Sequence, residues 1–147
     1  MRKLVPPVLF LLCLIFMYLL RRFWPVMFIF PSPYNLLGVV PIALGLLSGF
    51  SGVRQFIKAR TNLLPFREAD KLVTTGPFRY TRNPMYLGLA LALVGAWILF
   101  GHLSGFLGVL LFVIVADRWY IRFEEDMLQR IFGAEFEAYK KATRRWL

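Results

Sequence analysis

Cysteine and histidine are almost absent from the sequence. Cys13 is the one cysteine among 147 residues, so no disulfide forms within the chain and no cysteine metal cluster is possible. His102 is the one histidine, which argues against a histidine-based zinc site. We therefore expect no bound metal.

Acidic residues are also scarce: 8 Asp and Glu stand against 18 Lys and Arg, for a net charge of +10. Charged residues make up 18% of the chain, below the roughly 25% of a soluble domain, and mean hydropathy is +0.61. The apolar residues gather in long runs with the basic residues at their ends. This pattern predicts a polytopic membrane protein whose basic residues set its orientation and attract anionic lipid. It argues against a nucleic-acid-binding protein, since no recognition motif is present.

Two apolar runs precede residue 57. The first, Leu4–Leu20, leads into Arg21-Arg22 instead of a small-residue cleavage site, so we expect it to be a retained span and not a signal peptide. The second follows a proline-rich turn and is expected to run from near Leu36 to about Phe56. Its glycines recur at a spacing typical of close helix packing in lipid. They are Gly38, Gly45, Gly49 and Gly52.

The uncharged run from Asn83 to Ala116 is long for one span and has a Gly-His-Leu-Ser-Gly turn around His102. Seven Lys or Arg lie between residues 54 and 82, and seven more between residues 118 and 145. The positive-inside rule places both basic segments, and both chain termini, in the cytoplasm. We therefore expect a helical hairpin. Its two spans are Met85–Phe100 and Phe106–Tyr120.

The tail from Phe123 onward has apolar residues at helical spacing, interrupted at Gly133. It predicts an amphipathic helix, or two short ones, lying against the membrane or the cytoplasmic loop. The expected fold class is all-α: an integral protein of the inner or cell membrane with about four transmembrane helices and a C-terminal amphipathic cytoplasmic helix. Residues 1–56 hold the N-terminal spans, and residues 57–147 hold the loop, hairpin and tail of what is overall a single domain.

A first polar cluster lies at the start of the hairpin. Asn83 suits a helix N-cap and Pro84 the first helical position, so the unpaired N–H groups of this helix end are expected to attract anions. Arg79 and Arg82 add positive charge and a carboxylate-binding fork, and Tyr86 can stack or donate a hydrogen bond. Each residue alone also fits an ordinary membrane-interface belt, but the whole group fits it less well.

A second polar cluster follows the hairpin and contains Asp117, Arg118, Arg122, Glu124 and Glu125. Asp117 and Arg118 lie close to the hydrocarbon boundary, where charges are costly and often functional. Glu125 is within pairing reach of Arg122 on a helix. A hairpin would bring both clusters to one membrane face, where together they could hold a polar, zwitterionic ligand.

The two clusters resemble the isoprenylcysteine carboxyl methyltransferase family and its phospholipid methyltransferase relatives. The family pattern has Leu-Val-Thr-x-Gly and Arg-His-Pro-x-Tyr-x-Gly before a helical hairpin, then Glu-Glu, Phe-Gly and Tyr-x-x-Tyr after it. The matching residues are Leu72-Val73-Thr74, Gly76, Phe78, Arg82-Asn83-Pro84, Tyr86, Gly88, Glu124-Glu125, Leu128, Phe132-Gly133, Phe136 and Tyr139. The resemblance begins near Leu63 and continues to the C-terminus. Asn83 replaces the usual histidine, and Tyr120 stands where the family tends to place an arginine.

The resemblance implies a membrane methyltransferase, similar to the carboxyl O-methyltransferases, that uses S-adenosylmethionine. Its substrate would be a lipophilic small molecule, a lipid or a prenylated molecule at the cytoplasmic face. The implied cofactor-binding residues are Asp70, Lys71, Leu72, Val73, Phe78, Arg82, Asn83, Pro84, Met85, Tyr86 and Glu124. The expected catalytic residues are Arg118 or Arg122, to orient an anionic substrate group, and Glu125, to accept a proton from an amine substrate. A carboxylate substrate would need no base.

Two other functions fit the same sequence. One is an NADPH-dependent membrane reductase of related architecture, which competition between the two cofactors would distinguish. The other is a non-catalytic membrane adaptor that kept the fold, an interpretation that Asn83 and Tyr120 favour.

Overall fold

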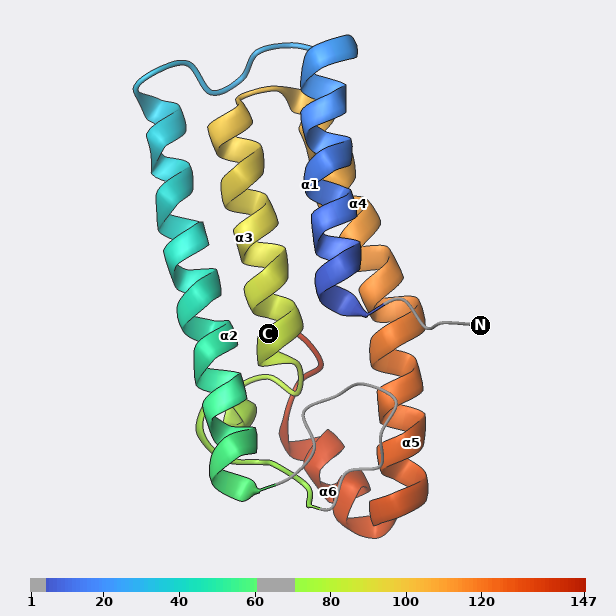
Figure 1. Cartoon of the computed structure of the whole chain (residues 1–147). Coiled ribbons are helices and arrows are strands. Elements are labelled where there is room, and N and C mark those ends of the chain that lie inside the picture. The colour runs from blue at the N-terminus through green and yellow to red at the C-terminus, as the bar shows by residue number, and fades with distance from the viewer. Residues whose placement is uncertain (1–4, 61–70) are drawn as a thin grey trace.

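The structure is a computed structural model that describes residues 5–60 and 71–147. These residues are helical, and β pairing among them is limited to two isolated bridges. Four helices run antiparallel as a bundle, and two more extend it at one end (Figure 1). In chain order they are α1 (Pro6–Phe23), α2 (Val39–Ala59), α3 (Pro84–Phe100), α4 (Phe106–Val115), α5 (Arg122–Phe132) and α6 (Ala134–Ala142).

Within residues 5–60 and 71–147, three helical segments are long and apolar enough to cross a membrane: Pro6–Phe23, Tyr34–Ala59 and Leu103–Phe132. α3 has 17 residues and is a fourth, shorter apolar helix, below the roughly 20 residues of an average span. It lies between α2 on one side and α1 and α4 on the other (Figure 1), and seven of its residues are buried. The expected all-α membrane fold, with a hairpin among its spans, is confirmed.

α1 ends later than the sequence predicts, because Arg21 and Arg22 belong to its last turn. A long arginine side chain can keep its stem on the helix while its charge reaches the interface, so these residues do not end the helix. The guanidinium of Arg21 lies 5.7 Å from the centre of the Phe100 ring. Both arginines thus lie at the end of the bundle remote from α5 and α6 (Figure 1).

The hairpin turn lies at that same remote end. Gly101 ends α3 with φ +80°, a conformation that strongly favours glycine. Its carbonyl accepts a hydrogen bond from Ile29 N at 2.8 Å, and Leu103 N donates to the Met27 carbonyl at 3.0 Å. The connection from α1 to α2 is therefore tied to the hairpin turn.

Glycines set the contact between α2 and α3. A Cβ atom added to Gly45 would meet the backbone carbonyl of Gly88, and one added to Gly88 would meet that of Gly45. Gly38, seven residues before Gly45, and Gly95, seven residues after Gly88, face each other in the same way. The two backbones can approach this closely only because these positions lack side chains, so the predicted packing role of Gly38 and Gly45 is confirmed. Gly49 differs, since an added Cβ would meet nothing within 4 Å.

α4 continues into α5 through a π-helical turn, Ala116–Ile121. Such a turn inserts one extra residue into the helix and is frequent at functional sites. α5 is separated from α6 at Gly133, where φ is +50°, so the tail forms two short helices. The apolar residues Phe136 and Tyr139 pack against Val73 and Phe78. The sequence left two surfaces open for the tail, the membrane and the loop before α3. These side chains contact the loop.

We expect Gly88→Leu to lower the free energy of unfolding by about 1–3 kcal/mol, because its side chain would be forced against the backbone of α2. The measurement is the thermal unfolding midpoint of the purified protein in detergent. Gly49→Ala is the matched control on the facing helix and is expected to leave the midpoint unchanged or raise it. A Gly88→Leu variant that unfolds at the wild-type temperature would contradict the close contact of α2 and α3.

Candidate functional site

A pocket opens where the start of α3, the loop before it, and α5 and α6 meet. Its lining contains every predicted cofactor-binding residue except Asp70, which lies outside the described residues. These are Lys71, Leu72, Val73, Phe78, Arg82, Asn83, Pro84, Met85, Tyr86 and Glu124. The remaining lining residues are Phe56, Glu125, Leu128, Phe136 and Tyr139. The hairpin therefore brings the two polar clusters together at one end of the bundle.

Asn83 lies where α3 begins, with Pro84 as the first helical residue, as the sequence predicts. Its side chain does not cap the helix: Nδ2 donates instead to the Arg145 carbonyl at 3.0 Å. Its backbone N donates to Thr81 Oγ1 at 3.1 Å. Asn83 therefore occupies the predicted N-cap position, but its side chain makes no capping hydrogen bond and contacts the chain's C-terminal segment instead.

Glu124 and Tyr86 face each other across the pocket. The Tyr86 hydroxyl donates to Glu124 Oε1 at 2.7 Å and joins α3 to α5. Tyr86 is 5% exposed and its ring stacks on that of Tyr120, with centroids 6.3 Å apart. The tyrosine at position 120 thus fills the space beside Tyr86. Glu124 itself is partly buried, and its hydrogen-bond donor is a neutral hydroxyl group.

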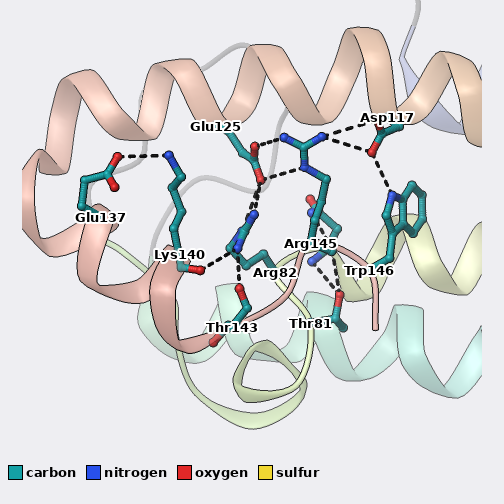
Figure 2. A network of polar contacts seen from close by, with 10 residues as sticks. Thr81, Arg82, Asp117, Glu125, Glu137, Lys140, Thr143, Arg145 and Trp146 are labelled. Atoms are coloured by element: carbon teal, nitrogen blue, oxygen red, sulfur yellow. Dashed lines mark hydrogen bonds and ion pairs between the residues drawn. The ribbon is translucent and has the colours of Figure 1, made fainter.

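Glu125 is held by two arginines (Figure 2). Arg82 donates to Glu125 Oε1 through Nη2 at 2.9 Å and Nε at 3.2 Å, and Arg145 donates to both carboxylate oxygens. Arg122, the partner that helix spacing predicts, is exposed. The expected Arg122–Glu125 pair is therefore replaced by contacts that connect α5 to the start of α3 and to the C-terminus.

The same arginines reach further polar groups. Arg82 Nη1 donates to the carbonyls of Lys140 and Thr143, and Arg145 Nη1 lies 3.3 Å from Asp117 Oδ1. Asp117 also accepts a hydrogen bond from the Trp146 indole at 2.9 Å. Hydrogen bonding to Glu125 and the two nearby carboxylates raises the pKa of Arg145 above its ordinary value. These contacts therefore favour the charged guanidinium.

Aromatic side chains form the wall of the pocket that faces the loop. The Phe56 and Phe78 rings meet edge to face, with centroids 5.5 Å apart. Phe136 is 1% exposed and Tyr139 is 9% exposed. The Tyr139 hydroxyl donates to the Phe78 carbonyl at 2.7 Å, and burial raises the pKa of Tyr139 to about 12. The tail thus closes the pocket with apolar rings.

Arg118 and Arg122, predicted to orient a substrate anion, do not line this pocket. The Arg118 side chain is 80% exposed and lies 3.9 Å from Asp117. Arg122 is also exposed. Of the three predicted catalytic residues, the structure places Glu125 in the pocket wall and the two arginines on the outer surface of the same helical segment.

An apolar groove of about 510 Å³ meets the pocket. α1 contributes Phe10, α2 contributes Gly49 and Phe50, and α3 contributes Leu89, among others. Pocket and groove share three lining residues, Met85, Tyr86 and Glu124. One carboxylate is therefore reached from a polar pocket at the bundle end and from an apolar groove along the spans.

Several residues of this site have no signal in the sequence that assigns them to it. Arg145 and Trp146 lie beyond the matched family motifs, and no helical spacing connects them to Glu125. Phe136 and Tyr139 belong to the apolar residues of the predicted amphipathic tail, for which the sequence indicates no pocket role. Their spacing of three residues predicts that they share one face of a helix. The residues that this face contacts, Val73 and Phe78, are more than 50 positions earlier in the chain.

Comparisons with known proteins agree with this arrangement. The profile of the phospholipid methyltransferase family matches residues 34–135, which include both polar clusters. A Haemophilus influenzae protein named "Uncharacterized protein" is 44% identical over 64 residues, which are 43% of this chain and 100% of that protein. No solved structure matches the chain. The family resemblance seen in the sequence is confirmed.

Because Tyr139 has a raised pKa, stability is expected to depend on alkaline pH. Below about pH 10 the tyrosine is neutral in both folded and unfolded chains, so its contribution is fully present, and it is lost as pH rises through about 12. Tyr139→Phe removes this dependence and, at pH 8, lowers the free energy of unfolding by about 1 kcal/mol. The measurement is the unfolding midpoint from pH 8 to 12, with the 79% exposed Tyr80 changed to Phe as the control. Parallel pH curves for wild type and Tyr139→Phe would contradict this expectation.

Proposed function

The chain belongs to the phospholipid methyltransferase family, a family of membrane methyltransferases, and we propose that it transfers a methyl group from S-adenosylmethionine to a lipophilic acceptor. The observation that carries the proposal is the wall shared by the polar pocket and the apolar groove. A water-soluble donor and a membrane-borne acceptor can reach the two sides of this wall. The pocket end is proposed to face the cytoplasm, because both basic segments of the chain lead to it.

The residues of the pocket fit S-adenosylmethionine. Glu124 is a carboxylate whose hydrogen-bond donor is the neutral Tyr86 hydroxyl. A carboxylate removed from water is costly unless a positive charge or several donors approach it, so a cationic ligand gains there. The aromatic rings of Phe56 and Phe78 offer an apolar surface for a flat base. Lys71, at the loop side of the lining, is a cation suited to the carboxylate of an amino acid.

S-adenosylmethionine supplies an activated methyl group on a positively charged sulfur, and the acceptor's nucleophile displaces it in line. The chain's part is to hold both molecules in that line, which is catalysis by proximity and orientation. Glu124 binds hydroxyl or amino groups of the donor, and Tyr86 fixes the orientation of that carboxylate. Arg82 holds the neighbouring Glu125 and thereby the turn of α5 that carries Glu124.

The groove suits the hydrocarbon chain of the acceptor. It is formed by apolar side chains of three spans, and among the described residues that line it Glu124 is the one that is charged. Apolar surface of an acceptor is stabilised there by burial, at about 25 cal/mol per Å². The glycine at position 49 leaves room at the floor of the groove, since its added Cβ would touch nothing. The acceptor's polar head would then lie at the shared wall.

Two nucleophiles fit that position. A carboxylate acceptor, which the resemblance implies, attacks without a base. An amine acceptor must first lose a proton, and Glu124 stands at the wall to receive it. Glu125, first predicted for that task, is bound to Arg82 and Arg145. An assay of acceptors should therefore include lipophilic acids and amine-headed lipids.

We expect Glu124→Gln to weaken S-adenosylmethionine binding at least about tenfold, because a hydrogen bond to a charged group contributes about 1.5–3 kcal/mol. The measurement is isothermal titration of the purified protein in detergent. Asp126→Asn changes an exposed acid on the same helix and should leave the affinity unchanged. Equal affinity of wild type and Glu124→Gln would remove Glu124 from the donor site. NADPH that binds and displaces the methyl donor would favour a reductase.

We expect Gly49→Leu to obstruct the groove and raise the KM for the acceptor at least about tenfold, because the added side chain displaces several methylene groups of the acceptor. The affinity for S-adenosylmethionine should be unchanged. The assay follows transfer of a labelled methyl group in membrane extracts, with products identified by mass spectrometry. Ala43→Leu adds similar bulk on the exposed side of α2 and is the control. A Gly49→Leu variant with the wild-type acceptor KM would place the acceptor elsewhere.

A further inference from the structure

The last residues of the chain, 143–147, return from α6 to the start of α3 (Figures 1 and 2). We name them the C-terminal strap. Four hydrogen bonds join the strap to the residues before α3, and one of them runs from Arg82 Nη1 to the Thr143 carbonyl. Arg82 N donates to the Arg144 carbonyl at 2.9 Å, while Thr81 Oγ1 and Asn83 Nδ2 donate to the Arg145 carbonyl at 3.1 and 3.0 Å.

The side chain of Arg145 joins the strap to the opposite wall. Its guanidinium donates to both oxygens of Glu125 on α5 and reaches Asp117 in the π-helical turn. The Trp146 indole donates to the same aspartate. Residue 145 therefore contacts both walls of the pocket, one through its carbonyl and the other through its guanidinium.

We propose that Arg145 is a positioning residue for the methyl-donor pocket, and this inference rests on the proposed function. Glu125 is adjacent to Glu124, and Asn83 is adjacent to the first turn of α3, which carries Tyr86. By holding Glu125 and Asn83 together, Arg145 fixes the separation of Glu124 from the start of α3 before any ligand binds. A pocket organised in this way loses less free energy on binding to the ordering of its walls.

The contacts of Arg145 distinguish positioning from general stabilisation. Its side chain is 35% exposed, and its ion pairs are with Glu125 and Asp117, at the pocket end of the bundle. An ion pair with one partially exposed member contributes modestly to global stability. A small displacement of a binding group can nevertheless reduce ligand binding and turnover by about 10- to 100-fold.

The test compares Arg145→Gln with three other variants in the full-length protein in detergent. Arg145→Lys keeps the charge but loses the planar fork. Arg144→Gln changes the neighbouring residue of the strap, whose side chain is exposed. Leu93→Ala removes a side chain that is 0% exposed in the bundle core and lowers stability away from the pocket. The measurements are the Kd for S-adenosylmethionine, the unfolding midpoint, and amide hydrogen exchange in peptides containing Arg82 without ligand.

Arg145→Gln is expected to raise the Kd about 10- to 100-fold and to speed exchange near Arg82. Arg145→Lys should fall between this variant and wild type, while Arg144→Gln and the folded Leu93→Ala variant should keep the wild-type Kd. A wild-type Kd in Arg145→Gln overturns the proposal, as does an equal loss of affinity in Leu93→Ala.

Two further comparisons test the proposal if Arg145→Gln does not fold or if wild type does not bind S-adenosylmethionine. If Arg145→Gln does not fold, Asp117→Asn and Trp146→Phe each remove one support of the strap, and unchanged Kd and exchange in both overturn the proposal. If wild type binds no S-adenosylmethionine, the proposed function fails, and exchange near Arg82 alone decides the strap: faster exchange in Arg145→Gln supports it, and unchanged exchange overturns it.

Discussion

The carboxylate of Glu125, shared between two guanidiniums, is the interaction on which the site depends. Arg82 comes from the residue pair before α3, Arg145 from the C-terminal strap, and Glu125 from α5, so a single anion connects three segments that are far apart in sequence. The side chains of Arg82 and Glu125 are 11% and 12% exposed, which leaves little solvent to screen them. Removing Glu125 would leave the largely buried Arg82 guanidinium without its carboxylate, which is usually far more costly than the pair is stabilising. The pocket end of the bundle is therefore held by charge in a chain that is otherwise held by apolar packing.

The glycine contact between α2 and α3 determines the other half of the site. At Gly45 and Gly88 the two backbones touch, while at Gly49, one turn further along α2, an added Cβ would enter open space. The same set of small residues thus produces a close backbone contact and part of the lining of the groove. Helix association in lipid relies on such close approach. Lipid tails are as apolar as the helix surfaces, so there is no hydrophobic driving force between the helices. The groove is consequently a property of the backbone, not only of the side chains that line it.

Much of this arrangement could be predicted from the sequence, because long apolar runs and the charges between them depend on local composition. The hairpin turn around His102, the break at Gly133 and the assembly of both polar clusters follow from such patterns. Three details could not be predicted. Asn83 has the sequence of an N-cap, but its amide is taken by a carbonyl that lies 62 residues later. Glu125 has a helix neighbour at pairing distance, but two remote arginines hold it. Arg118 and Arg122 carry suitable charge, but the direction of their side chains depends on a π-helical turn whose sequence has no distinct signature.

The wall formed by Met85, Tyr86 and Glu124 also has a kinetic meaning under the proposed function. A donor arriving from water and an acceptor diffusing within the bilayer would meet there without either one crossing into the other's phase. The rate would then follow the surface density of the acceptor in the membrane, counted per area of lipid, and not its amount per volume of cell. The methylated product could leave sideways into the leaflet from which the acceptor came, while the spent donor returned to the aqueous side.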